Sequence, residues 1–201
     1  EEPNLGLVAA LQNKLGKLRL DEIIFNIDAV SDTGDAKDRI TRVLLNQLNQ
    51  FRGYNNSNIA LALYLEKPLD EKGLFAAFKE QVRAAFNETW DNNQIRFART
   101  YLDKIIDIAR QFDPDIDKEA LKATILNKKQ DYTIHFLIDE IDDYLSSKTE
   151  DHRLIFLMDE VSQYIGSDTT LLLNLQTIVE EIGSRIGPRA WIVCTAQQEL
   201  K

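Results

Sequence analysis

Three short apolar runs along the chain have the pattern of strands buried in a sheet. They are residues 21–30 (DEIIFNIDAV), 154–158 (LIFLM) and 190–197 (AWIVCTAQ), and polar residues flank or end each of them. Short, continuous apolar runs between polar residues are typical of buried strands, and the first run is rich in isoleucine. The pattern therefore predicts three strands, with Asp28 near the carboxyl end of the first.

Most other apolar residues recur at helical spacing. The stripes run through residues 40–51, 74–86, 101–112, 118–127 and 172–182, with a weaker one at 7–15. Gly53 is placed to end the first, and Asp168 or Thr169 to cap the last, which Gly187 and Pro188 then stop. Further breaks are expected at residues 55–58, Pro68, Gly73 and 112–115. The strands at 154–158 and 190–197 thus flank a helix, which predicts a βαβ unit with parallel strands.

Two stretches share an Asp-Glu pair but differ in apolar pattern. In residues 133–147 (TIHFLIDEIDDYLSS) the apolar positions form one helical stripe, made of Ile134, Leu137, Ile138, Ile141, Tyr144 and Leu145. Its acids fall off that stripe and are expected to form a solvated face, namely Asp139, Glu140, Asp142 and Asp143. In residues 152–166 (HRLIFLMDEVSQYIG) the acids Asp159 and Glu160 instead follow the predicted strand directly.

The predicted strands end in groups that suit nucleotide chemistry. In open α/β sheets, ligands bind beyond the carboxyl ends of the strands. An acid there can hold Mg²⁺ through a water, and a second acid can polarise the attacking water. Asp159 and Glu160 stand in the order of this Walker B arrangement. Thr195 and Gln197, at the end of the neighbouring predicted strand, are placed to sense the γ-phosphate of a bound nucleotide. An apolar run followed by Asp-Glu is a common pattern and is weak evidence by itself. The polar ends of the neighbouring predicted strands strengthen the prediction of a nucleotide site.

Composition limits the other function classes. The chain has 201 residues, 44% hydrophobic and 28% charged, which fits one globular domain or one domain with a sizeable insertion. The net charge of −9 disfavours direct binding of nucleic acid by this chain. Cys194, the one cysteine, lies in an apolar run and is expected in the core of a protein from a reducing compartment. No secretory signal or membrane-length run is seen, so a cytoplasmic location is expected.

A phosphate-binding loop is missing from the chain. A Walker A loop reads Gly-x-x-x-x-Gly-Lys-Ser/Thr, but around Gly16 and Lys17 the first glycine is replaced by Leu11 and the hydroxyl residue by Leu18. The chain by itself is therefore expected to show little or no ATPase activity. Its two histidines, His135 and His152, have no partners at zinc-ligand spacing.

The sequences of two segments resemble one protein family. Residues 152–199, with DEVSQYIG, LNLQTIVEEIG and PRAWIVCTAQ, closely resemble the Walker B region of the large P-loop ATPase of BREX bacteriophage-exclusion systems (the BrxC/PglY type). Residues 20–54, with DEIIFNIDAVSD and AKDRI, resemble an upstream strand and helix of that family less closely. Ser162 and Ala196 depart from the family pattern, which usually has Gly and often Ser there, but neither change removes a charge.

The resemblance implies a fold and a role. The fold is α/β, a partial P-loop NTPase-like parallel sheet from residues 1–56 and 148–201 with a large helical insertion at 57–147. In that class the Walker B strand lies between the strand before it and the sensor strand, positions that residues 154–158, 22–29 and 190–195 fit. A Walker A loop is expected upstream of Glu1. ATP and Mg²⁺ are then the parent protein's cofactors, and other BREX components or further copies its partners, with no membrane involved.

Residue roles follow from the resemblance at matching positions. Asp159 is similar to the Mg²⁺-associated acid and Glu160 to the catalytic glutamate. Thr195 and Gln197 match the sensor-like strand end, and Gln163 matches a glutamine without an assigned role.

Two other readings stay open. The chain can be a non-catalytic helical interaction module on a degenerate ATPase-like sheet, with its acids capping the next helix or pairing with Arg185 or Arg189. In the ATPase reading, those arginines could instead act in trans in an oligomer. A metal-dependent nuclease would use Asp28, Asp139 and Asp159, although Asp139 falls on a predicted helix.

Overall fold

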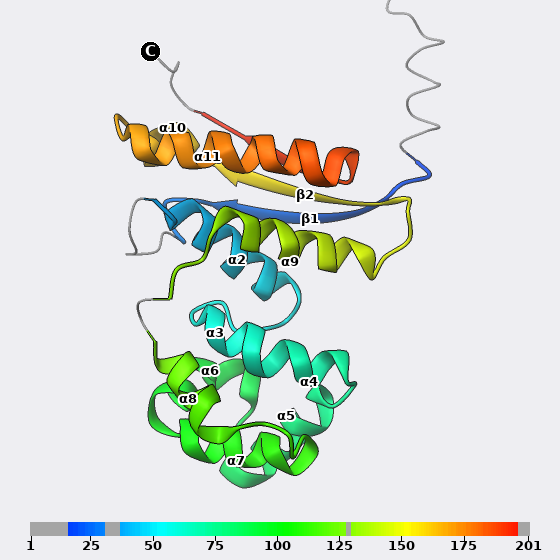
Figure 1. Cartoon of the computed structure of the whole chain (residues 1–201), viewed down its shortest axis with the longest axis vertical. Helices are drawn as coiled ribbons and strands as arrows, with labels where there is room; N and C mark the ends of the chain where they lie inside the picture. The colour runs from blue at the N-terminus through cyan, green and yellow to red at the C-terminus, as the bar shows by residue number, and fades with distance from the viewer. Residues whose placement is uncertain (1–15, 31–36, 128–129, 197–201) are drawn as a thin grey trace, which may run out of the picture. The chain divides into compact units, whose positions relative to one another are not determined.

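Three parallel strands form the sheet of this protein. They are β1 (Arg19–Asn26), β2 (His152–Asp159) and β3 (Ala190–Cys194), in the spatial order β1-β2-β3 (Figure 1). The register pairs Asn26 with Asp159 and Met158 with Cys194, so the carboxyl ends of the strands meet at one edge of the sheet. The three predicted strands and their parallel direction are confirmed.

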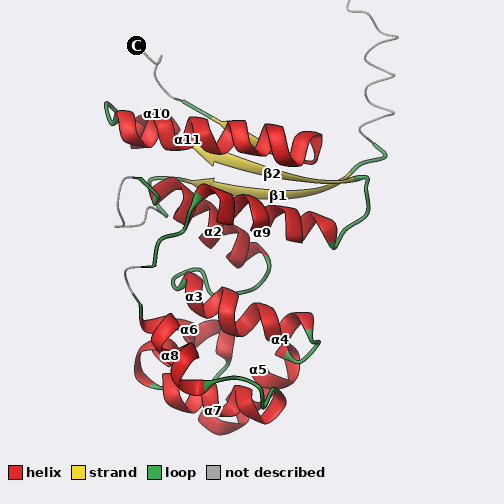
Figure 2. Ribbon diagram, in the orientation of Figure 1, coloured by secondary structure: helices red, strands yellow, loops and turns green. Residues whose placement is uncertain are grey.

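The computed structural model describes residues 16–30, 37–127 and 130–196. The chain divides into two compact units, one of Glu1–Leu44 with Tyr132–Lys201 and the other of Leu45–Asp131. The first holds the sheet and the second is helical (Figure 2). The helical stripe predicted at 7–15 lies outside the described residues. No helix in the described part of the chain is both long and apolar enough to cross a membrane.

Strand β1 ends earlier than its apolar run suggests. The Oδ1 atom of Asn26 accepts hydrogen bonds from the backbone N–H groups of Asp28 (2.9 Å) and Ala29 (3.3 Å). An asparagine that accepts from residues just after it turns the backbone out of the extended conformation. Asp28 therefore lies in a turn that follows the strand.

Helices of the first unit gather on one face of the sheet. They are α9 (Ile134–Ser146), α10 (Val161–Ile165), α11 (Thr169–Glu181) and the first turns of α2 (Arg39–Phe51), which continues into the second unit. Helix α9 packs on both β2 and α11, and Asn174 of α11 donates a hydrogen bond to Thr41 of α2 (3.4 Å). Both connections between neighbouring strands run in the same direction across the sheet. The right-handed rule for such crossovers places their helices on the same side.

The ends of these helices follow the predicted signals. Asp168 caps α11 by accepting from the backbone N–H groups of Thr170 (2.9 Å) and Leu171 (3.2 Å). A π turn (Ile182–Ile186) and a 3₁₀ turn (Gly187–Arg189) then lead into β3. Gly187 takes a φ of +64°, which glycine adopts without the strain other residues meet.

Burial on the sheet is one-sided, which corrects two expectations. The core side chains alternate along the strands and include Ile23, Phe25, Leu154, Phe156 and Met158. Ile24, expected in a buried strand, is exposed because it points to the other face. Cys194, expected in the core, is exposed because it ends the outer strand of the described sheet.

The second unit has an aromatic core. Its elements are the later part of α2, then α3 (Ile59–Leu61), a π turn (Ala62–Glu66), α4 (Lys67–Glu71), α5 (Phe75–Phe86), α6 (Trp90–Thr100), α7 (Leu102–Phe112) and α8 (Lys118–Leu126). Phe78, Trp90 and Phe97 are buried and in ring contact. The expected break at Pro68 is wrong, because the helix passes through it. Proline cannot donate to the preceding turn, and the wider π turn before it accommodates this.

The unit boundary differs from the predicted insertion at residues 57–147. Helix α9 belongs with the sheet, because its apolar stripe packs on β2 and α11. Asp139, Asp142 and Asp143 are exposed, as expected for a solvated face. Glu140 is an exception, being only 8% exposed. It follows Leu137 by three residues and therefore flanks the buried stripe instead of opposing it.

Candidate functional site

Asp159 and Glu160 lie at the carboxyl edge of the sheet, on its middle strand. Asp159 is the last residue of β2, and Glu160 is the residue that starts the turn into α10. Glu160 has a left-handed backbone, with φ of +61°. This conformation costs a residue with a side chain roughly 1–2 kcal/mol, so neighbouring bonds must hold it.

Thr195 supplies part of that support. Its hydroxyl donates a hydrogen bond to Oδ1 of Asp159, and its backbone carbonyl accepts from Val161 N–H (3.2 Å). The N–H of Glu160 donates to the same Asp159 Oδ1 (2.9 Å) and to Thr195 Oγ1 (3.4 Å). Among the described residues Asp159 Oδ2 accepts no hydrogen bond, so this oxygen is available to a cation or its water. Asp159 and Thr195, from neighbouring strand ends, are therefore in direct contact.

Asn26 is a site residue that the sequence analysis missed. Its side-chain Nδ2 donates to Oε2 of Glu160 from the end of β1. Asn26 aligns with Asp159 in the strand register, and Thr195 follows β3 one place beyond the pair Met158–Cys194. The three strand ends thus present an amide, a carboxylate and a hydroxyl side by side. The strand register is what identifies Asn26 as part of this edge, and the parallel direction of the strands alone does not fix it.

The other predicted residues near this edge contribute less. Asp28 is exposed in the turn after β1, and none of its described bonds joins its carboxylate to Asp159 or Glu160. Gln163 is exposed on α10, with its backbone N–H bonded to the carbonyl of Glu160 (3.1 Å). Gln197 lies outside the described residues.

Arg185 and Arg189 lie toward the opposite edge of the sheet. Arg189 immediately precedes β3, so about six residues, or roughly 20 Å of extended chain, separate it from Thr195. Its guanidinium donates to the carbonyls of Leu145 (2.6 Å) and Thr149 (3.3 Å). Arg185 pairs with Asp139 at 2.5 Å. The reading in which these arginines pair with Asp159 or Glu160 is wrong.

Two other interpretations of the acids, helix capping and a nuclease metal site, are not supported by the structure. Glu160 precedes α10, but its side chain makes no cap hydrogen bond to that helix. The nuclease set does not assemble either, because Asp139, on α9, pairs with Arg185 and has no described bond to Asp28 or Asp159. Across residues 16–30, 37–127 and 130–196, no three His, Cys, Asp or Glu side chains come together as a metal site. One carboxylate with waters and phosphate oxygens is a usual Mg²⁺ environment, and Asp159 fits that.

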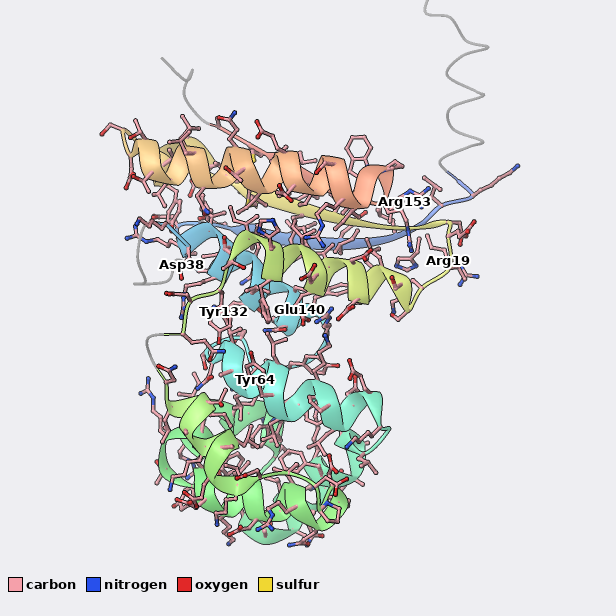
Figure 3. The ribbon with its side chains drawn as sticks, in the orientation of Figure 1. Arg19, Asp38, Tyr64, Tyr132, Glu140 and Arg153 are labelled. Carbon is pink, nitrogen blue, oxygen red and sulfur yellow. The ribbon has the colours of Figure 1, made fainter. Side chains whose placement is uncertain are left out.

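A separate polar cluster fastens the amino ends of β1 and β2. Both Tyr144 Oη and His152 Nε2 lie in hydrogen-bond contact with Asp21 Oδ2. Burial raises the pKa of Asp21, but the bonds from Tyr144 and His152 outweigh it and leave this pKa below its ordinary value. Arg19 and Arg153 lie at the same end of the strands (Figure 3). His152 is therefore structural, and His135 is exposed on α9.

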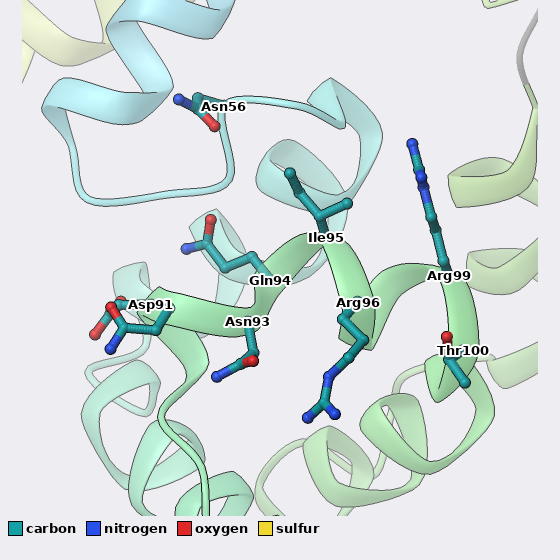
Figure 4. Close-up of a pocket in the computed structure, with 9 residues that line it drawn as sticks. Asn56, Asp91, Asn93, Gln94, Ile95, Arg96, Arg99 and Thr100 are labelled. Atoms are coloured by element: carbon teal, nitrogen blue, oxygen red, sulfur yellow. The ribbon is translucent and has the colours of Figure 1, made fainter.

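A polar hollow of about 460 Å³ lies in the helical unit (Figure 4). It is lined mostly by α6, with residues that include Asn93, Gln94, Ile95 and Arg99, and by Asn56. In Figure 4 these side chains spread along the helix instead of pointing to one spot. The hollow therefore has no group of converging polar atoms comparable to the edge at Asp159.

Comparison with protein-family models finds no match, and no solved structure matches the chain.

Proposed function

We propose that this chain provides the magnesium-holding and water-activating half of an ATP-hydrolysing P-loop site, in a BREX-type anti-phage ATPase. The observation that carries the proposal is the meeting of Asn26, Asp159, Glu160 and Thr195 at the carboxyl edge of three parallel strands. Ligands of open parallel sheets bind at this edge. The resemblance of residues 152–199 to the BREX ATPase supplies the family.

Each side chain has a separate task in this proposal. Asp159 holds Mg²⁺ through water at Oδ2, while Thr195 and the backbone of Glu160 fix its other oxygen. Glu160 polarises the attacking water, and Asn26 orients its carboxylate. Thr195 links Asp159, the proposed Mg²⁺-holding residue, to the end of the neighbouring strand, where the γ-phosphate would be sensed. Mg²⁺, when bound, neutralises charge on the phosphates.

The phosphate cradle is supplied from elsewhere in this proposal. The chain has no Gly-x-x-x-x-Gly-Lys-Ser/Thr sequence, and the proposal assigns this loop to sequence upstream of Glu1. The working protein then binds ATP and Mg²⁺ in the cytoplasm, with other BREX components or further copies as partners. A Gly-x-x-x-x-Gly-Lys-Ser/Thr run upstream, after a strand-like segment, is the first observation expected.

A non-catalytic interaction module is the second candidate. It is favoured by the missing phosphate loop and by the helical unit, which has a core of its own around Phe78, Trp90 and Phe97. In this case the Asp159 edge would be a relic. The two candidates differ in whether the full-length protein hydrolyses ATP through Asp159.

The test is a magnesium titration of ATP hydrolysis by the full-length protein and its Asp159→Asn variant. We expect the variant to lose at least about 100-fold of the rate, since metal-held charge contributes several kcal/mol to such reactions. Asp142→Asn, at an exposed position on α9, is the matched control and should keep the wild-type rate. Equal rates for wild type and Asp159→Asn would remove this acid from the site. No hydrolysis by the wild type would favour the interaction module.

A further inference from the structure

Asp159 and Thr195 point away from the helices that pack on the sheet. Successive side chains of a strand point to opposite faces. Met158 is 1% exposed and points to the helices, so Asp159 points to the side that the described helices leave uncovered, which we call the open side. On β3, Cys194 is the register partner of Met158, and Thr195 N–H continues the ladder by donating to the Met158 carbonyl (3.0 Å). Thr195 therefore shares the open side with Asp159, as their hydrogen bond requires.

Asn26 and Glu160 meet on the same side of the sheet. Asn26 follows the buried Phe25 and is the register partner of Asp159, so its amide also lies on the open side. The backbone of Glu160 has left the extended conformation, with φ of +61°, and its Oε2 returns to Asn26 Nδ2. The polar side chains of this edge are thus gathered on one side of the strand ends.

Helix α10 occupies the other side of β2 and β3 at this edge. It begins directly after Glu160 and lies beside α11. Its first residue, Val161, donates a backbone hydrogen bond to the carbonyl of Thr195 (3.2 Å), which fastens the helix to the end of β3. Val161 and Ile165 are buried there. A ligand that reached Asp159 from this side would have to displace these packed side chains.

The open side of the edge, in contrast, is accessible. The row of side chains directly behind the polar groups is apolar, and it crosses the three strands through the register pairs Ile24–Leu157 and Leu157–Val193. Ile24 is 67% exposed and Val193 41%. Farther from the edge the same side carries Glu22 and Arg153, so its surface is mixed there.

We propose that Mg²⁺ and the nucleotide phosphates bind on the open side of the strand ends, next to the row Ile24–Leu157–Val193, and not on the side of α10. This inference rests on the proposed function, which assigns the edge to Mg²⁺ and phosphates, and it adds the side from which they approach. Apolar neighbours lower the local dielectric constant and so strengthen the attraction between Mg²⁺ and Asp159. The three apolar side chains are therefore part of the site.

Paramagnetic relaxation of methyl groups in the full-length protein tests this placement. Co²⁺ replaces Mg²⁺ together with a nonhydrolysable ATP analogue, and the added longitudinal relaxation falls steeply with distance from the ion. Samples with Mg²⁺, and with Co²⁺ but no nucleotide, are the references. Leu157 and Met158 are adjacent on β2 and point to opposite sides, and the variants Leu157→Val and Met158→Leu assign their signals. We expect the added rate at Leu157 to be at least about threefold that at Met158, although Met158 is closer to Asp159 in sequence.

The possible results separate this inference from the proposed function. An added rate at Met158 equal to or larger than that at Leu157 would overturn the placement and leave the proposed function intact. Added relaxation at neither side chain would show that the ion is held elsewhere, which would overturn both. Asp159→Asn should remove the added relaxation from both methyl groups, because it removes the carboxylate that holds the ion.

Discussion

Asn26 and Glu160, 134 residues apart in sequence, are joined by a hydrogen bond from the asparagine Nδ2 to the glutamate Oε2. The orientation of the amide is fixed by the other side of Asn26, whose Oδ1 accepts from Asp28 N–H (2.9 Å) and Ala29 N–H (3.3 Å). Since the oxygen is occupied by these backbone donors, the NH₂ group must face the carboxylate. One side chain therefore takes part both in the turn that ends β1 and in the orientation of Glu160.

Substitutions of Asn26 separate these two roles. Asn26→Ala loses both, and we expect a lower ATPase kcat in the full-length protein and a loss of about 1 kcal/mol in unfolding free energy. Asn26→Asp keeps an oxygen for the backbone N–H groups but places a negative charge against Glu160. Asn26→Asp should therefore keep most of the stability and lose at least as much kcat as Asn26→Ala. Paired urea-unfolding and steady-state kinetics measure both. If Asn26→Asp keeps the wild-type kcat, the contact with Glu160 has no part in hydrolysis.

Thr195 is expected to act through its hydroxyl. Thr195→Val keeps the shape of the side chain but removes the donor to Asp159 Oδ1. One lost hydrogen bond of about 1.4 kcal/mol corresponds to roughly a tenfold lower rate of ATP hydrolysis in the full-length protein. Thr195→Ser, which keeps the hydroxyl, should stay within about twofold of wild type. Similar losses in both variants would point to packing instead of the hydroxyl.

Glu66 should make the helical unit less stable as the pH rises. Burial raises the pKa of this carboxyl to about 7, against bonds from Asn55 N–H (2.5 Å) and Trp90 Nε1 (2.6 Å). Its unfolded value is near 4.5, so the folded state holds more protons between these pH values. The stabilisation from Glu66 is therefore full below pH 4.5 and is lost as the pH rises through 7.

Glu66→Gln removes this titration. Thermal midpoints of wild type and Glu66→Gln, measured from pH 5 to pH 8, should diverge in favour of the variant as the pH rises. Other groups titrate in both proteins alike, so the difference between the two curves isolates Glu66. A constant difference over this range would show that Glu66 does not titrate there.

Asp21 should contribute stability with the opposite pH dependence to that of Glu66. Its folded pKa lies below the unfolded value of 3.8, owing to the bonds from Tyr144 and His152. The contribution is therefore present above pH 3.8 and is lost as the pH falls through the folded pKa. Asp21→Asn should lower the thermal midpoint at pH 6, with the gap to wild type closing toward pH 3. Asp142→Asn, at an exposed position, should show no such gap.

The sequence predicts what depends on local pattern. The apolar runs located all three strands, and the strand-helix-strand order gave their parallel direction. The meeting of Asp159 with Thr195 followed from that order, because parallel strands bring their carboxyl ends to one edge. Asn26 escaped notice because its role depends on strand register, which no neighbouring residue encodes.

Burial was harder to predict because it depends on what covers each face. The run around Ile24 is apolar on both sides of the strand, yet the described helices cover only one side. Cys194 has apolar neighbours but ends the outer strand of the described sheet. Glu140 lies next to the apolar stripe of its helix and is buried. The spacing of residues along the sequence did not distinguish it from the exposed acids nearby.

The most direct test of the account is ATP binding and hydrolysis by the full-length protein carrying Glu160→Gln. The amide can still meet Asn26, but it cannot polarise the attacking water as a base. We expect ATP affinity within about threefold of wild type and single-turnover hydrolysis reduced by about 100-fold or more. Glu150→Gln, at an exposed position in the turn before β2, should leave both quantities unchanged. Hydrolysis by Glu160→Gln at the wild-type rate would contradict the assignment of this edge as the catalytic half of an ATPase site.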